Sequence, residues 1–271
     1  MQDFKNLLFL RQCIVVAAIL VSQVHAAFEY QSYAWAAAAA NIRVVGDPHL
    51  DRYSLNPSLM SSSVPSQFMV QYARPFNGLS LNSGSLRALH HVRNIPVLEY
   101  VEYFGDDVYS ELALGAARAW SLDSNFCVGA NLSLYRLALS GFESQTALTL
   151  SSSLYFELTP DIHFGSSMQH LLQVGRALSL PQSFQFGMEY HNGSFRILFS
   201  FEKEAALPMD LCFGLISSSK RSWQIACGYR DLSGSLSAGW RIKLGQYAAH
   251  YSWVRHPDLP DSYGFGMEIY F

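Results

Sequence analysis

The sequence predicts an all-β protein, a transmembrane antiparallel up-and-down β-barrel of about fourteen strands with a short N-terminal helical plug segment. Apolar and polar residues alternate strictly in segments that recur from residue 66 to residue 271, which is the pattern of strands with two different faces. Half of the residues are hydrophobic and only 14% are charged, yet mean hydropathy is +0.10, so apolar and polar residues must be interleaved. No internal stretch reaches the roughly 20 apolar residues of a transmembrane helix.

The first predicted element is a cleaved secretory signal over residues 1–26. Lys5 and Arg11 flank a short apolar core from Ile14 to Val24, and His25 and Ala26 follow before the expected cut. A membrane anchor is the alternative, but the core is short for a membrane span. The signal predicts a mature chain in the envelope of a Gram-negative bacterium.

Residues 27–65 are predicted to form a plug-like segment. The alanine-rich stretch Gln31–Val45 favours a helix by composition, and Gly46–Pro48 ends it. Asn56 is expected to cap a short helical turn that has Pro57 at its first position. Two arrangements fit this segment: a surface helix with a turn, or a plug folded into or under the barrel.

The barrel itself is predicted over residues 66–271. Its alternating segments are long enough to cross a bilayer as strands, and twelve or sixteen strands fit nearly as well as fourteen. The fourteen predicted strands are Phe68–Arg74, Leu79–Leu86, Val97–Phe104, Tyr109–Trp120, Phe126–Leu139, Ala147–Leu158, Ile162–Gln169, Ser183–His191, Phe195–Lys203, Met209–Ile216, Trp223–Arg230, Ser235–Ile242, Tyr247–Trp253 and Tyr263–Phe271.

One hairpin can be aligned in detail, because Asn192-Gly193 is a strong two-residue turn signal. With that loop, Tyr190 faces Phe195 and Glu189 faces Arg196. One side of the hairpin is then apolar throughout, and the other side is polar. A soluble β-sandwich would bury such an apolar face in its core, and a membrane barrel would turn it toward lipid.

The final strand carries the expected signal for the barrel-assembly machinery, an alternating run with an aromatic end. The residues of this signal are Tyr263, Phe265, Met267, Ile269 and Phe271. This strand is predicted to close the ring by pairing with the first strand, near Phe68–Arg74. Tight turns follow every second strand, as at Asn192-Gly193, while connections such as His170–Gln182 are longer. Because periplasmic turns are the short ones, both termini are predicted to be periplasmic.

The three cysteines of the mature chain are interpreted as small residues of the barrel wall. Cys212 and Cys227 fall in neighbouring strands but on opposite faces, and an odd number cannot all pair internally. The five histidines from His163 onward are scattered over strands and loops. No catalytic set, cofactor motif or metal-binding spacing stands out. The sequence therefore predicts a protein that is not an enzyme and that binds neither a cofactor nor a metal ion.

The charged residues that the alternation places on the inner side of the wall are interpreted as lumen-facing. They would hydrate and brace the barrel interior, or line a substrate path. The net charge of −3 gives no reason to expect a nucleic-acid partner. The lumen-facing candidates are Glu111, Glu157, Glu189, Arg196, Glu202, Arg241 and Glu268.

The chain resembles the FadL-like outer-membrane barrels, and within them the PorV and PorQ branch. In that family an N-terminal stretch rich in glycine and alanine leads to an Asn-Pro-Ala-Leu type of box, and here the box is Asn56, Pro57, Ser58 and Leu59. This chain departs in having alanine in place of glycine, Ser58 in place of alanine, and a shorter length. The C-terminal segments that carry the resemblance are Pro208–Gly214, Ala226–Tyr229, Ala248–Ser252, His256 and Ser262–Gly266.

The resemblance implies a location in the outer membrane, with its lipid as surroundings, and two functions. The first is a channel for hydrophobic small molecules such as long-chain fatty acids, released through a gap in the wall or past the plug that the Asn-Pro box helps to seat. The second is a non-transporting partner of secretion-system proteins, of the type IX kind. The alternative, if the chain does not belong to this family, is a soluble secreted all-β protein.

Overall fold

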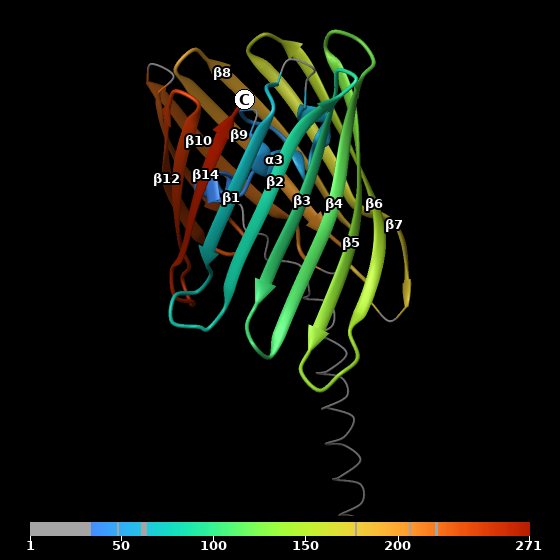
Figure 1. Cartoon of the computed structure of the whole chain (residues 1–271). Helices are drawn as coiled ribbons and strands as arrows, with labels where there is room; N and C mark the ends of the chain where they lie inside the picture. The colour runs from blue at the N-terminus through green and yellow to red at the C-terminus, as the bar shows by residue number, and fades with distance from the viewer. Residues whose placement is uncertain (1–33, 48, 61–63, 177, 206, 220–221) are drawn as a thin grey trace, which may run out of the picture.

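The chain folds into a closed antiparallel barrel in which each strand pairs with its sequence neighbours and the last strand pairs with the first (Figure 1). A computed structural model describes residues 34–47, 49–60, 64–176, 178–205, 207–219 and 222–271. The predicted signal over residues 1–26 lies outside the described residues. The fourteen predicted strands are all present, and the first predicted segment of the barrel, Phe68–Arg74, lies within the first strand.

Most strands extend a few residues beyond their predicted bounds, because the alternating pattern fades near the ends while backbone pairing continues. The strands are β1 Gln67–Arg74, β2 Asn82–Val92, β3 Ile95–Gly105, β4 Tyr109–Ser121, β5 Phe126–Leu139, β6 Gln145–Thr159, β7 Ile162–Arg176, β8 Ser183–Asn192, β9 Phe195–Glu204, β10 Asp210–Ser219, β11 Trp223–Arg230, β12 Ser235–Leu244, β13 Tyr247–Arg255 and β14 Ser262–Tyr270.

The seam between β1 and β14 confirms the predicted closure of the ring. Phe68 of β1 lies opposite Ile269 of β14, and Arg74 lies opposite Tyr263. The C-terminus therefore lies at the barrel end that also carries the short turns β2–β3, β6–β7, β8–β9 and β12–β13 (Figure 1). We call this end the short-turn end and the opposite end the loop end.

The wall has an apolar outer face and a polar inner face. Leu132, Phe199 and Met267 are exposed on the outside, whereas Ser133 and Ser200, one residue further along their strands, are buried inside. This alternation is what a bilayer requires of a barrel wall, since lipid can contact the outer side chains while the inner ones meet polar partners. Among the described helices, none is long and apolar enough to cross a bilayer.

Replacing Leu132 with arginine should destabilise the barrel strongly in lipid. Leu132 is 50% exposed at the middle of β5, and a cation on the lipid face at the bilayer midplane costs about 2–4 kcal/mol. Leu207→Arg, in the connection between β9 and β10, is the matched control and should cost little. Denaturant unfolding of both variants in lipid vesicles measures the difference, and equal midpoints would contradict a lipid-facing wall.

The β8–β9 hairpin has the predicted faces but not the predicted register. Tyr190 lies opposite Ile197 and Asn192 opposite Phe195, so the loop is Gly193-Ser194, with Gly193 in the left-handed region at φ +52°. The predicted pairing of β8 with β9 is therefore shifted by two residues from the observed one. Because side chains alternate with period two, a shift of two leaves both faces unchanged, which is why the sequence pattern could not detect it.

Strand β7 continues past its predicted end. It runs to Arg176 through an irregularity at His170, whose φ is +55°, so the loop expected over His170–Gln182 is reduced to the connection between Arg176 and Ser183. The prediction missed this because a β-bulge interrupts strict alternation. The described cysteines are free, and Cys212 is buried while Cys227 is exposed, as expected for opposite faces.

The segment before the barrel lies inside the ring of strands (Figure 1). It contains helix α2 Ala34–Ala38, helix α3 Leu50–Tyr53 and the single 3₁₀ turn η2 Pro57–Leu59. The helix expected over Gln31–Val45 is thus much shorter among the described residues, and residues 39–47 follow the wall as irregular chain. We refer to residues 34–60 as the plug.

Candidate functional site

The plug fills the middle of the lumen and is fastened to the wall by hydrogen bonds and an ion pair. The plug residues Trp35, Ile42, Leu50 and Tyr53 are fully buried. Within the described residues, polar groups of six strands bond to the plug, mostly to its backbone, at 2.5–3.1 Å. The strand residues that make these contacts are Asn131, Ser153, Gln169, Glu189, Ser237 and Glu268.

Small inward-facing residues let the plug backbone approach the wall. A Cβ atom added at Gly165 of β7 would lie 1.8 Å from the carbonyl oxygen of Val44, and one added at Gly228 of β11 would lie 2.3 Å from the amide nitrogen of Ala40. Real Cβ atoms do not come so close to backbone atoms. These two glycines therefore allow a backbone-to-backbone contact that any other residue would prevent.

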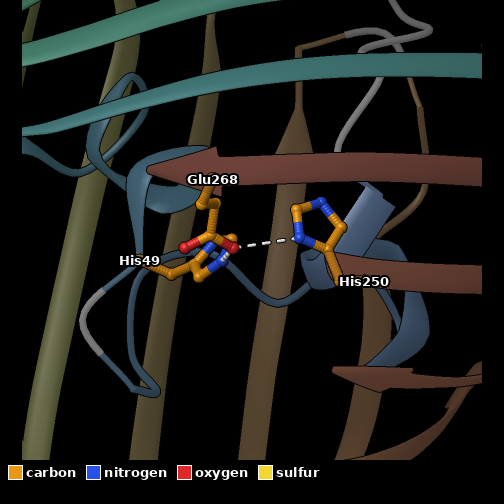
Figure 2. A group of neighbouring side chains, drawn as sticks. All are labelled: His49, His250 and Glu268. Carbon is orange, nitrogen blue, oxygen red and sulfur yellow. Dashed lines mark hydrogen bonds and ion pairs between the residues drawn. The ribbon is translucent and has the colours of Figure 1, made fainter. Parts of the chain in front are cut away.

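A buried cluster joins the plug to the closing strand (Figure 2). His49, at the N-terminal end of α3, places Nε2 2.5 Å from Oε1 of Glu268 in β14 and Nδ1 2.6 Å from Oδ1 of Asp51. His250 of β13 also bonds to Glu268, at 3.0 Å, and Arg241 of β12 contacts both of its carboxylate oxygens at 3.1–3.2 Å. We call His49, Asp51, His250, Arg241 and Glu268 the latch.

His49 holds the latch together as an imidazolium. Both of its ring nitrogens face carboxylate oxygens, and a carboxylate can only accept, so each nitrogen must carry a proton. Burial disfavours the charged ring, but the carboxylates of Asp51 and Glu268 outweigh burial and raise the pKa of His49 to about 9. Burial also opposes ionisation of Asp51, yet the charge of His49 holds the pKa of that carboxyl well below its usual range.

The charges around the latch balance when His49 is protonated. Asp47 forms an ion pair with Arg52 at 2.5 Å and accepts a hydrogen bond from the Trp35 indole at 3.2 Å. Together with the latch, this neighbourhood contains three carboxylates and two guanidinium groups. The imidazolium supplies the third positive charge, so the buried network is neutral, which is the condition for keeping charges in a low-dielectric interior.

His49, His250 and Glu268 are also residue types that hold metal ions, and their ligating atoms lie within 4.8 Å of one another. Their geometry is that of hydrogen bonds. A zinc ion shared by His49 and Glu268, with bonds of about 2.0–2.2 Å, would separate Nε2 and Oε1 to about 3 Å or more, compared with the short contact between them here. The arrangement therefore functions as an ion-pair network.

Cavities lie on both sides of the plug. At the loop end, a cavity of about 390 Å³ lies between α2 and the wall, and apolar surface predominates in it. Its lining includes Ala37, Phe76, Val254 and Leu259. At the short-turn end, a wider cavity of about 820 Å³ is lined by mixed polar residues, among them Glu157, Arg196 and Arg241. The plug separates the two.

The predicted lumen-facing residues lie on the inner face, in two groups. Glu157, Glu189, Arg196, Arg241 and Glu268 lie toward the short-turn half, where Arg196 bonds to Glu189. In the loop half, Glu202 pairs with Arg230 at 3.1 Å and Glu111 accepts a hydrogen bond from Tyr109. Two of them contact the plug: Glu189 accepts from the Gly46 amide and Glu268 bonds to His49.

The Asn-Pro box lies in the plug, where Asn56 differs from expectation. Its side chain does not cap the turn that starts at Pro57, but donates to the carbonyl of Val44 at 2.7 Å. Asn56 thus ties two plug segments together, while the Ser58 amide donates to Ser153 of the wall. Leu59 packs against the apolar cluster formed by Leu50 and its neighbours.

The expected assembly residues lie on the outer face at the end of the chain. Phe265 and Met267 are exposed on β14, Phe271 is the most exposed at 80%, and Tyr263 and Ile269 are half-buried on the same strand. Their role in assembly stays a prediction.

Sequence reasoning missed the plug half of the latch. His49 and Asp51 lie in a segment that has no alternation, and His250 was grouped with the scattered histidines. The available signal was local: a histidine two residues before an aspartate, directly before a short helix. Its partner, Glu268, is more than 200 residues away, and sequence spacing gives no sign of such a contact.

Comparison with known proteins gives matches at the level of structure alone, because no protein-family model and no curated protein sequence matches the chain. The fold is similar to that of the Ralstonia pickettii toluene transporter TbuX, with 11% identity, a TM-score of 0.65, and coverage of 90% of this chain and 100% of that one. The Pseudomonas putida toluene transporter TodX gives 8% identity, a TM-score of 0.63, and coverage of 89% and 98%. The monoaromatic hydrocarbon channel CymD gives 12% identity, a TM-score of 0.65, and coverage of 89% of this chain and 97% of that one. What the chain shares with these proteins is the barrel fold.

Proposed function

We propose that this protein is an outer-membrane channel for small hydrophobic molecules. The observation that carries the proposal is the apolar cavity of about 390 Å³ between α2 and the wall, a volume within the usual range of small-molecule sites. A molecule reaching it from the loop end would sit against the plug. The fold similarity to a monoaromatic hydrocarbon channel and two toluene transporters supports the same class of cargo.

In this proposal the loop end faces the outside of the cell and the short-turn end faces the periplasm. Short periplasmic turns and longer outer loops are the rule for such barrels, and the connections β1–β2, β7–β8 and β13–β14 are the longest here. Both termini would then be periplasmic. Passage from the apolar cavity to the wider polar one requires the plug to move.

The charges of the apolar cavity favour uncharged cargo over long-chain fatty acids. Arg230 is the guanidinium that lines it within the described part of the chain, and it is already paired with Asp210 at 2.5 Å and with Glu202 at 3.1 Å. A fatty-acid carboxylate entering here would compete with two carboxylates for one cation. We therefore expect toluene to be taken up better than oleate.

Replacing Val254 with tryptophan tests the site directly. Val254 points inward from β13 into the apolar cavity, and a tryptophan there would fill much of it. Uptake of radiolabelled toluene by cells that produce the variant should fall about tenfold or more, since a blocked pocket removes the binding step. The matched control is Leu236→Trp, on the outer face of neighbouring β12, which should leave uptake unchanged.

Oleate uptake in the same cells separates the cargo classes. Toluene uptake without oleate uptake supports the proposal, and oleate uptake without toluene uptake would assign the channel to long-chain fatty acids. Equal toluene uptake in producing and non-producing cells, with heat-modifiable barrel present in the membrane, would refute the channel.

A second function is favoured by one observation. The plug is bonded to six strands and closes the described lumen between the two cavities, which suits a barrel that does not transport, as in the PorV and PorQ branch. Such a protein would act by docking secretion-system proteins. Affinity purification from detergent extracts tests this: recovery of a large secretion complex, together with absent toluene uptake, would favour this function over the channel.

A further inference from the structure

The outer face of the wall carries a groove of about 490 Å³ over strands β1–β6. Its lining includes the small residues Ala88, Gly115 and Ala116, so the wall is recessed between larger neighbours. The larger lining residues are apolar and exposed, which is the character of a lipid-facing surface. They are Leu86, Val101, Leu114, Leu132, Leu134 and Leu148. The groove is therefore a seat for a long apolar group such as an acyl chain.

Glu99 places a carboxylate on this lipid-facing surface. It lines the groove and alternates along β3 with the buried residues Leu98 and Tyr100, so its side chain points outward. Among the carboxylates of the described strands, Glu99 is the one on the outer face. A charged group next to lipid is costly, and such residues mark functional sites.

Arg118 places a cation beside Glu99. Glu99 lies opposite Ala116 in the pairing of β3 with β4, and Arg118 is the next outward residue of β4. The two charged residues are thus diagonal neighbours, roughly 7–8 Å apart at the backbone. The central carbon of the guanidinium lies 4.8 Å from the centroid of the Trp120 ring, near the short-turn end of β4. Because aromatic side chains at strand ends mark the level of the lipid head groups, the cation is held at the membrane interface.

These opposite charges do not pair with each other. Within the described residues, neither Glu99 nor Arg118 has an ion-pair partner, and Nε of Arg118 is buried without a hydrogen-bond partner. An unpaired anion and an unpaired cation at the edge of an apolar groove are complementary to a zwitterionic head joined to an acyl chain. Phospholipid heads of the ethanolamine type have this form, with an anionic phosphate and a primary ammonium on a short ethylene linker. The phosphate suits the forked donors of the guanidinium, and the ammonium suits the carboxylate, which only accepts.

We propose that the groove is a binding site for one zwitterionic phospholipid with a primary ammonium. The ammonium donates to Glu99, the phosphate accepts from Arg118, and one acyl chain lies in the groove against Leu86 and Leu114. In the orientation proposed above, this site faces the periplasmic leaflet, which is the phospholipid leaflet of an outer membrane. The site is on the outside of the wall, so it goes beyond the proposed channel and does not depend on what the lumen transports.

Native mass spectrometry of the purified full-length protein, titrated with single lipids in detergent, tests the proposal. Dioleoyl-phosphatidylethanolamine, dioleoyl-phosphatidylcholine and dioleoyl-phosphatidylglycerol share their acyl chains and differ in the head. The ethanolamine lipid should bind about tenfold more tightly than the choline lipid, because a quaternary ammonium has no proton to donate to Glu99. It should also bind more tightly than the glycerol lipid, whose head has no cation. Equal binding of the three lipids would overturn the inference.

Two substitutions assign the head to its residues. Glu99→Gln should reduce the preference for the ethanolamine lipid over the choline lipid from about tenfold to about twofold, and Glu157→Gln, in the cavity at the short-turn end, is the matched control. Arg118→Gln should weaken the binding of all three lipids about tenfold through the phosphate. Arg136→Gln, exposed on the outer face of β5 toward the loop end, is its control. An unchanged preference in Glu99→Gln would contradict the site.

If Glu99→Gln fails to give a heat-modifiable barrel, Ala116→Trp takes its place, since a tryptophan there fills the groove. It should reduce binding of the ethanolamine lipid about tenfold, whereas Ala238→Trp, on the outer face of β12, should not. Unchanged binding in Ala116→Trp would overturn the inference. So would a membrane protein in place of the lipid, seen in the same spectra as a heavier complex. Toluene uptake tests the channel separately from all of these outcomes.

Discussion

Replacing His49 with alanine is expected to release the plug and raise the ion conductance of the reconstituted barrel. His49 joins Asp51 and Glu268 with both ring nitrogens in a site without solvent exposure. Removing one partner from a buried ion-pair network costs about 3–5 kcal/mol, because the remaining charges stay buried and uncompensated. The seating of the plug would weaken by that amount, and the plug would spend a measurable fraction of time displaced.

Single-channel recording in planar bilayers measures this effect as longer and more frequent open states. His90→Ala, on the outer face of β2, is the matched histidine control and should record like the parent. A His49→Ala barrel that stays as closed as the parent, with plug residues still protected from added protease, would show that the latch does not hold the plug.

The same latch predicts that alkaline pH opens the barrel. Docking raises the pKa of His49 from its ordinary 6.5 to about 9, so the proton stabilises the docked plug fully below pH 6.5 and this stabilisation is lost as the pH rises through about 9. The titratable groups that face the ring are Asp51 from α3, Glu268 from β14 and His250 from β13, and Arg241 from β12 contacts Glu268 behind them. Conductance should therefore rise between pH 7 and about 10 in the parent and be flat over that range in His49→Ala.

Replacing Gly165 with leucine is the second change with a large expected effect. The new Cβ would fall 1.8 Å from the Val44 carbonyl oxygen, so residues 42–47 of the plug must leave their position against β7. Overpacking of this kind costs about 1–3 kcal/mol and more where backbone must move. Gly46 would then lose its hydrogen bond to Glu189, and Asn56 its bond to Val44.

The measurement for Gly165→Leu is limited proteolysis in outer-membrane vesicles, which should cut the plug while the barrel stays heat-modifiable. Gly84→Leu in β2 is the control, because its Cβ would meet only the Gln71 carbonyl oxygen, at 3.6 Å. Equal resistance of both variants to the protease would contradict the close contact between the plug backbone and β7.

The barrel could be predicted from the sequence because its signal is local and repeated. Each strand alternates on its own, so Trp223–Arg230 and Phe126–Leu139 were located at their observed bounds without knowledge of their partners. The short turns after every second strand indicated which strand ends lie together at one end of the barrel. Register was less accessible, as the displaced β8–β9 hairpin shows, because two registers two residues apart bury the same faces.

The site could not be predicted, because its contacts join distant segments that carry no pattern. Glu268 was recognised as lumen-facing from its place in β14, but nothing in the sequence indicates that His49 would reach it. His170 was assigned to a loop, since a bulge breaks the alternation that identifies strands. The polar residues of a lumen are predictable as a class, and their pairing depends on which plug residue arrives opposite them.

The seam of the barrel and the docking of the plug share their residues, and this makes the two events thermodynamically reciprocal. Gln71 of β1 contacts His250 of β13 at 3.2 Å, and His250 contacts Glu268 of β14, which holds His49. The first and last strands are thus cross-braced from the inside by the network that seats the plug. By linkage, closing the seam stabilises the docked plug by the same free energy as docking the plug stabilises the seam. A barrel in which β1 and β14 have not yet paired cannot retain its plug. A closed barrel without its plug separates more easily at the β1–β14 seam.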